Sequence, residues 1–432
     1  MQDSLEQVQR YVAEWILPIE GPAIHQGYMS VKNGEIVALG TIDTLETALR
    51  QALPPIRPGS ILTPGLINTH THIEQSYKEP VIKTSSMSFA DWLLKVIAQN
   101  RSPEHSGLPA LKARCAAGIK ELLATGTTCV NDIASGQGSL LQLQQAGLRG
   151  IVSLEVFHPG FDSVEIAHWV KQYEALQTAL LKQSRLLQVG LSPHSPYNVS
   201  PAAWQALLNA CKPALVHTHA AEFQAENNYL ASCNMASSNE IVKLHQSVLG
   251  KRFGAQPNAR LSNNGGAIAY LDAFNLLNSH TLIAHARCTT AAERQRLATC
   301  GVSVSHCPRS NMALHGNTLQ WADWSELPIV IGLGTDGRLS TTDLDMRAEG
   351  RLAMRLHNWN AGFTWRMLTL NGAKALGLHA DIGSLRVGKQ ADFVLWQAEA
   401  PVANLPEEAA LRENTRTQSV WVNGRCLWRK PA

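Results

Sequence analysis

The sequence predicts an α/β fold, a (β/α)8 barrel accompanied by a small β-domain. Eight short apolar segments rich in β-branched residues alternate with longer segments of helical periodicity, and both ends of the chain carry hairpin signals instead. A length of 432 residues allows several ordinary domains or one large barrel with additions. The regular alternation of strands and helices favours the barrel.

Each predicted barrel strand is a short apolar run, as a strand buried on both faces requires. The eight segments are Ile61–His72, Thr127–Ile133, Ile151–Phe157, Leu187–His194, Ala214–Ala220, Thr281–Ala286, Val302–Cys307 and Ile329–Asp336.

Helices are predicted between these strands. In Leu108–Ala124, apolar side chains such as Leu111, Cys115 and Ile119 recur on one face, and Gly126 provides a stop. A second helix is announced by the capping box Thr290–Glu293.

The two chain ends are expected to form the β-domain together. Tyr28–Gly40 contains Asn33-Gly34 and Ser419–Trp428 contains Asn423-Gly424, each of which is typical of a type I′ hairpin, and Asp392–Trp396 reads as a further strand. We therefore expect residues 1–60 and 381–432 to form a small, sandwich-like β-domain and residues 61–380 to form the barrel.

Composition restricts the partners and the compartment. With 37 Lys and Arg against 34 Asp and Glu, the net charge is only +3, so neither nucleic acid nor a membrane is the expected partner. No apolar run is long enough to span a bilayer, and the N-terminus lacks the pattern of a signal peptide. The eight cysteines contain no Cys-x-x-Cys pair, which favours a reducing, cytoplasmic location.

Histidines and carboxylates occur where the predicted strands end, which is where barrels place their active sites. His70 and His72 alternate at the end of the first strand, so both imidazoles face the same side. The remaining strand-end residues are His217, His219, Glu222, His285 and Asp336. A chain with 16 histidines places some near strand ends by chance, but four strands ending in this way favour a metal site. Three imidazoles and one carboxylate suit a divalent ion such as zinc.

These segments resemble the amidohydrolase superfamily, and within it the branch of cytosine deaminase and the chlorohydrolases. The resemblance covers nearly the whole chain. Its motifs are Pro64–His72, Gly126–Thr128, Ser192–Pro196, His217–Glu222, Leu282–His285, His306–Asn311, Leu333–Asp336 and Gly383–Asp392.

The resemblance implies a metal-dependent deaminase. It implies that one metal ion is bound and that protons are moved by a partly overlapping set of residues. The implied ligands are His70, His72, His219 and Asp336, and the implied proton carriers are Glu222, His285 and Asp336. Members with two metals carry a lysine at the end of strand four, which Leu187–His194 lacks, so one ion is expected, zinc or else iron. A small-molecule substrate and a homodimer are also expected.

Three further residues are candidates for substrate contacts. His194 would meet a ribose or another hydroxyl, or alternatively bond to loop backbone. Arg309 follows strand seven and would meet an anionic or polar substrate tail. Trp92 follows strand one where the family places substrate contacts, although packing is the alternative.

Substrate identity depends on weaker signals. Thr71–Ser76, Phe89–Leu93, Asn131–Ile133 and Ser153–Phe157 resemble the aminodeoxyfutalosine deaminases, although Gln75 replaces a leucine often found there. An adenine nucleoside derivative is therefore expected, of the aminodeoxyfutalosine, adenosine or S-adenosylhomocysteine type. A free aminopurine, a pterin and an s-triazine chlorohydrolase substrate stay open.

Two other classes of function are disfavoured. Gly332–Gly337 matches the dinucleotide fingerprint G-x-G-x-x-G, but it follows the eighth strand instead of the first, and Asp336 would repel a pyrophosphate. An NAD-dependent oxidoreductase is therefore not expected. An inactive binding homologue would require the loss of a site residue, and none is missing.

Overall fold

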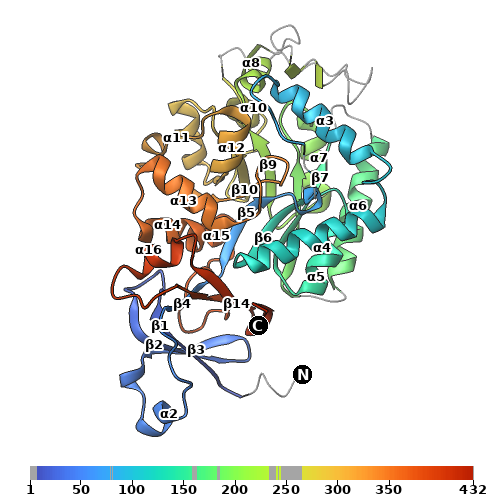
Figure 1. Ribbon diagram of the computed structural model, residues 1–432. Helices are drawn as coiled ribbons and strands as arrows, with labels where there is room; N and C mark the ends of the chain where they lie inside the picture. The colour runs from blue at the N-terminus through green and yellow to red at the C-terminus, as the bar shows by residue number, and fades with distance from the viewer. Residues whose placement is uncertain are drawn as a thin grey trace.

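The computed structural model consists of a barrel and a second sheet built from both ends of the chain (Figure 1). It describes residues 7–77, 79, 81–157, 163–181, 185–232, 240–241, 243–244 and 265–431. The predicted fold class is confirmed.

Eight parallel strands form the barrel in chain order, each paired with the next. They are β5 (Leu66–Thr71), β6 (Thr127–Ala134), β7 (Arg149–Val156), β8 (Leu187–Pro193), β9 (Val216–Ala220), β10 (Thr281–His285), β11 (Ser303–His306) and β12 (Val330–Leu333). The barrel closes just past β12, where the Asp336 N–H donates to the His70 carbonyl at 3.0 Å. This closure brings the carboxyl ends of the first and last strands together.

Helices surround the barrel on its outside (Figure 1). Those of the barrel region are α3 (Phe89–Arg101), α4 (Leu108–Ala124), α5 (Gln137–Ala146), α6 (Ser163–Leu181), α7 (Pro201–Cys211), α8 (Gln224–Ser232), α10 (Ala267–Ala273), α11 (Ala291–Thr299), α12 (Pro308–His315), α13 (Met346–His357), α14 (Ala361–Leu368) and α15 (Leu370–Ala375). The predicted bounds of α4 are confirmed. Among the described residues, no helix is both long and apolar enough to span a membrane.

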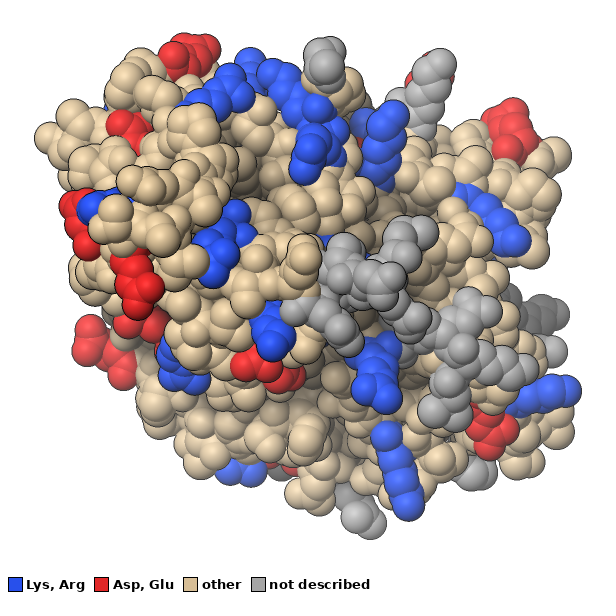
Figure 2. Space-filling view, turned by 90° about the horizontal axis from the view of Figure 1, so that it is seen from below, with Lys and Arg blue, Asp and Glu red and all other residues tan. Residues whose placement is uncertain are grey.

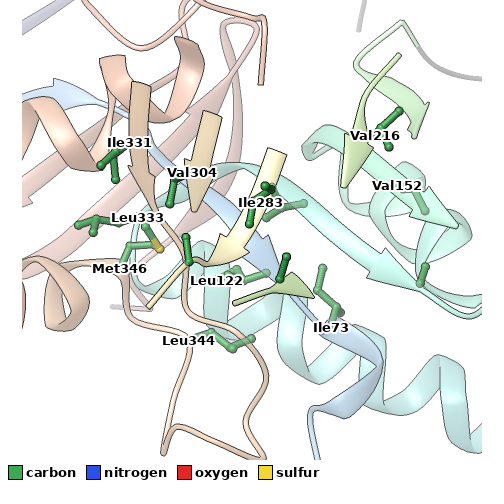
Figure 3. Packing of buried hydrophobic residues seen from close by; sticks show 14 of the residues in the cluster. Ile73, Leu122, Val152, Val216, Ile283, Val304, Ile331, Leu333, Leu344 and Met346 are labelled. Carbon is green, nitrogen blue, oxygen red and sulfur yellow. The ribbon is translucent and has the colours of Figure 1, made fainter. Parts of the chain in front are cut away.

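Apolar side chains of strands and helices form a large core (Figure 3), and two smaller clusters accompany it. Ile283 of β10 and Val304 of β11 are fully buried, and so are Leu122 of α4 and Met346 of α13. Because interiors are close-packed, this core holds the strand ends in fixed positions. The side chains that follow those ends are positioned with them.

The two chain ends share one mixed, seven-stranded sheet, which refines the sandwich-like arrangement expected. Its order is β15 (Arg425–Arg429), β14 (Arg416–Val422), β13 (Phe393–Gln397), β4 (Ser60–Pro64), β1 (Gln9–Ile16), β2 (Ile24–Lys32) and β3 (Glu35–Thr41). Two short helices, α2 (Thr47–Gln51) and α16 (Pro406–Leu411), complete these parts of the chain. Both hairpins are confirmed, because Asn33, Gly34, Asn423 and Gly424 all have the positive φ that a type I′ turn requires.

The predicted strand Ile61–His72 is wrong in one respect, since it is two strands in two sheets. β4 belongs to the end sheet and β5 to the barrel, and Gly65 separates them. A Cβ at Gly65 would lie 1.9 Å from the Thr128 hydroxyl oxygen, so only glycine fits at this crossing. The domain boundary expected after residue 60 lies at the start of β4, whereas the end sheet and the barrel separate a few residues later, at Gly65.

A buried ion pair joins the end sheet to the base of the barrel. The Arg149 guanidinium at the start of β7 donates two hydrogen bonds to the Asp392 carboxylate, at 2.6 and 3.1 Å. Asp392 also accepts the N–H of Asn423 at 2.8 Å.

On the face seen from below in Figure 2, basic and acidic side chains are interspersed among uncharged residues.

The capping box of α11 yields a stability prediction. The Thr290 hydroxyl accepts the N–H of Glu293 at 3.2 Å, and the Glu293 carboxylate accepts the N–H of Thr290 at 2.9 Å. Thr290→Ala removes the first bond, so we expect the free energy of unfolding in urea to fall by ~1 kcal/mol. Thr299→Ala, in the last turn of the same helix, is the control and should change it little. Equal losses in both variants would contradict a capping role.

Candidate active site

The four predicted metal ligands converge at the mouth of the barrel. His70 and His72 come from the end of β5, His219 from β9, and Asp336 from the segment after β12. The Nε2 atoms of His70 and His72 each lie 3.4 Å from Asp336 Oδ1. The Nε2 atoms of His72 and His219 are 3.4 Å apart. All four side chains are buried.

The donor set fits a divalent metal ion. Both ring nitrogens of His70 are buried, and neither has a hydrogen-bond partner among the described residues. Donor atoms of His70, His72 and His219 lie within 4.8 Å of one another, as do those of His70, His285 and Asp336. Buried polar atoms without partners are costly, and a cation bound by His70 Nε2 would satisfy one of these two nitrogens.

Outer hydrogen bonds orient two of these ligands. His219 Nδ1 donates to the His194 carbonyl at 2.8 Å, which leaves Nε2 directed toward His72. Asp336 Oδ2 accepts the hydroxyls of Ser310 at 2.6 Å and Ser340 at 2.9 Å, which leaves Oδ1 for the histidines. Such outer partners fix the tautomer and orientation of metal ligands.

Burial sets the protonation of the cluster. It lowers the pKa of His72 to about 3 and that of His219 well below its usual range, so both imidazoles are neutral at pH 7. Burial opposes ionisation of Asp336, but the neighbouring His70 holds the pKa of that carboxyl well below its usual range. Neutral imidazole and ionised carboxylate are the forms that bind metal.

Glu222 and His285 lie beside this cluster. Glu222 Oε1 is 3.9 Å from His285 Nε2 and 3.1 Å from His315 Nε2. Burial acts to raise the pKa of Glu222, but His285 and His315 outweigh it and lower the pKa. Glu222 is therefore a buried carboxylate held ionised between two imidazoles.

Strained backbone is concentrated at these strand ends. Ala221, His285, Ala286 and Asp336 all have positive φ, at 53°, 72°, 46° and 59°. Residues other than glycine rarely adopt this conformation, and such strain gathers at functional sites. The strained residues thus lie at or just after the ends of β9, β10 and β12, beside the predicted site residues.

His194 lies at the edge of the same mouth. Its ring is 4.8 Å from that of His219 and stacks on Phe157 at 4.5 Å. Its Nδ1 is 2.7 Å from the Asn198 amide, and its Nε2 faces Glu155 Oε1 at 3.9 Å. The imidazole therefore has one anchored nitrogen and one directed toward a second polar side chain.

Two predicted substrate-binding residues have partners of their own. The Arg309 guanidinium binds both carboxylate oxygens of Asp343, at 2.6 and 3.0 Å. The Trp92 indole N–H donates to the Val81 carbonyl at 3.0 Å, and its ring is buried against Phe89. Their substrate contacts stay predictions.

Two residues beside the site were not identified from the sequence. Glu155 alternates with Ser153 along β7 and with Phe157 just after it, and this period of two could have indicated a side chain facing the barrel interior. His315 lies one helical turn after Asn311, whose amide is 3.0 Å from His285 Nδ1. That spacing places both on one face of α12.

Comparison with known proteins gives one family. The Amidohydrolase family pattern matches residues 61–427. The 5-methylthioadenosine/S-adenosylhomocysteine deaminase of Teredinibacter turnerae is 28% identical over 392 residues, covering 86% of this chain and 80% of that protein. The 5'-deoxyadenosine deaminase of Methanosphaera stadtmanae is 28% identical over 363 residues, covering 79% and 75%.

Two solved structures of deaminases have the same fold as this chain. An adenosine deaminase from Xanthomonas campestris with bound zinc superposes with a TM-score of 0.77 at 26% identity, covering 96% of this chain and 92% of that one. The aminofutalosine deaminase of Helicobacter pylori, in complex with methylthio-coformycin, has a TM-score of 0.81 at 21% identity, covering 97% and 99%. The second likeness supports the fold alone.

Proposed function

Because this chain belongs to the amidohydrolase family, we propose that it is a hydrolytic deaminase that releases ammonia from an adenine nucleoside derivative. The observation that carries the proposal is the convergence of three histidines and Asp336 beside Glu222 and His285. The deaminase names of the relatives support the same chemistry. We propose zinc as the ion, with iron as the alternative, and the zinc in the Xanthomonas campestris protein supports this choice.

The residues present can perform each proton transfer. His70, His72, His219 and Asp336 would hold the ion, whose chemistry when bound is to lower the pKa of a water molecule toward ~7. Asp336 and His285 accept a proton from the attacking water. Glu222 takes up the first proton of the attacking water and delivers it to the ring nitrogen beside the carbon that carries the amino group. That carbon gains the water oxygen, and Asp336 and His285 pass the second proton of the water to the amino group, which leaves as ammonia.

His194 and Glu155 form the proposed subsite for a sugar hydroxyl. Their side chains are 15% and 13% exposed, and His194 Nε2 faces Glu155 Oε1 across 3.9 Å. A hydroxyl both donates and accepts a hydrogen bond, and it can therefore engage an imidazole and a carboxyl together. A free base has no group to place there.

We expect His194→Ala to weaken catalysis on a nucleoside selectively. Loss of the imidazole leaves a sugar hydroxyl unpaired, which should cost a ribosylated substrate ~1–3 kcal/mol in kcat/KM and a free base little. The measurement is kcat/KM for adenosine and adenine with both proteins. Equal losses on both substrates would assign His194 a structural role, and no loss on either would favour a free aminopurine or pterin.

A substrate panel tests the proposed function. Zinc-loaded protein is assayed for ammonia release from adenosine, 5'-deoxyadenosine, S-adenosylhomocysteine, aminodeoxyfutalosine, adenine and an aminated pterin, and for chloride release from a chlorinated s-triazine. We expect the fastest turnover on an adenine nucleoside. Faster turnover of a free base, the pterin or the triazine would overturn the substrate assignment.

The proposal also includes a cellular compartment and an oligomeric state. The described cysteines, seven in number, are free thiols, which supports a reducing compartment such as the cytoplasm. A homodimer is proposed from the family resemblance.

A further inference from the structure

His315 is the direct side-chain partner of the proposed proton carrier. Its Nε2 lies 3.1 Å from Glu222 Oε1, and its side chain is only 6% exposed. His315 is the last residue of α12, while Glu222 follows β9, so the contact joins two elements distant in sequence. A hydrogen bond to a charged acceptor is stronger than one between neutral groups.

Two aromatic rings hold the His315 imidazole in place. The Phe89 ring of α3 lies 5.2 Å away, and the Phe223 ring, next to Glu222 in the chain, lies 6.4 Å away and nearly parallel at 5°. Phe89 and Phe223 are themselves 4.7 Å apart. This packing restricts rotation of the ring and so keeps Nε2 directed at the carboxylate.

A second connection fixes the backbone on both sides of this contact. Arg287 Nε donates to the Glu222 carbonyl at 2.8 Å. The same guanidinium bonds through Nη1 to the side chain of Asn317, two residues after His315. Gly316 between them has φ 73°, the left-handed conformation that ends α12. The end of α12 is therefore tied to Glu222 through a side chain and through Arg287.

We infer that His315 is a positioning residue that holds the Glu222 carboxylate in the orientation required for proton transfer. The inference rests on the proposed function and goes beyond it, since it assigns a role to a residue outside the metal ligands and proton carriers. Without this hydrogen bond, the Glu222 carboxylate rotates about its side-chain bonds. It is then aligned with the ring nitrogen in a smaller fraction of enzyme–substrate complexes. Loss of His315 should therefore lower kcat more than it changes KM.

Two substitutions separate the hydrogen bond from the ring packing. His315→Phe keeps an aromatic ring beside Phe89 and Phe223 but removes the donor. His315→Gln gives up the ring but restores an N–H donor at similar reach. We expect His315→Phe to lower kcat on the best nucleoside ~10-fold or more, with KM within ~2-fold and metal content unchanged. We expect His315→Gln to recover most of the lost kcat.

Nitrogen-15 NMR of the histidine side chains tests the contact independently of activity. The wild-type protein should show an Nε2-bonded proton for His315 that is protected from exchange, and Glu222→Ala should remove the protection. Wild-type kcat in His315→Phe, or equal loss in both His315 variants, would overturn the inference. An unprotected His315 proton in the wild-type protein would also overturn it. A wild-type chain that releases no ammonia overturns the proposed function instead, and the NMR result then decides whether His315 orients Glu222.

Discussion

Glu222→Gln is expected to lower turnover by ~10²-fold or more while the metal content stays at the wild-type level. Glutamine keeps the shape of the side chain and can still accept the His315 hydrogen bond, but it cannot take up and deliver a proton. Glu222 is not one of the four predicted ligands, and its Oε1 is paired with His315 and directed toward His285. The measurements are steady-state ammonia release and elemental analysis of the same preparation.

Glu293→Gln is a matched control for this variant. Glu293 is a similarly buried carboxylate, but it belongs to the capping box of α11 and lies outside the site. It should cost stability and leave kcat nearly unchanged. Near-normal turnover in Glu222→Gln would show that another group carries the proton.

His219→Ala is expected to abolish metal binding and, with it, measurable turnover. The imidazole is the only predicted ligand from β9, and its Nε2 is directed at His72 while its Nδ1 is anchored on the His194 carbonyl. The wild-type protein should carry close to one zinc or iron per chain, and His70→Ala should lose it in the same way. Removing one ligand of a four-ligand site leaves the ion with incomplete coordination.

The control for metal loss is His280→Ala. His280 is exposed and precedes β10 at the opposite end of the barrel from the site, so its removal should change neither metal content nor turnover. Full metal occupancy in both His219→Ala and His70→Ala would contradict the ligand assignment.

The barrel was predictable because its signals are local. Buried parallel strands are continuous apolar runs, and their ends fell within a few residues of those predicted. The Thr290 capping box and the two Asn-Gly hairpins are also encoded by neighbouring residues. The first predicted strand was wrong because an apolar run does not record a change of sheet, which here depends on the packing of Gly65 against Thr128.

Site residues could be predicted where strand periodicity determines the direction of the side chain. They could not be predicted where the side chain contacts a residue distant in the sequence. His70 and His72 converge with Asp336 as their positions at strand ends indicated. The Arg309 pairing with Asp343 joins residues 34 positions apart, and no local pattern reveals it. His315 was missed for the same reason, because its partner Glu222 is 93 positions away.

Deamination of a nucleoside in water enriched in oxygen-18 tests the central claim most directly. If water replaces the amino group, the purine product gains one oxygen-18 atom at the carbon that carried nitrogen, and one ammonia is released for each product molecule. We expect this result for zinc-loaded wild-type protein with the best nucleoside of the panel, and no labelled product with His219→Ala. A product without oxygen-18, or product formed without ammonia, would contradict hydrolytic deamination at this site.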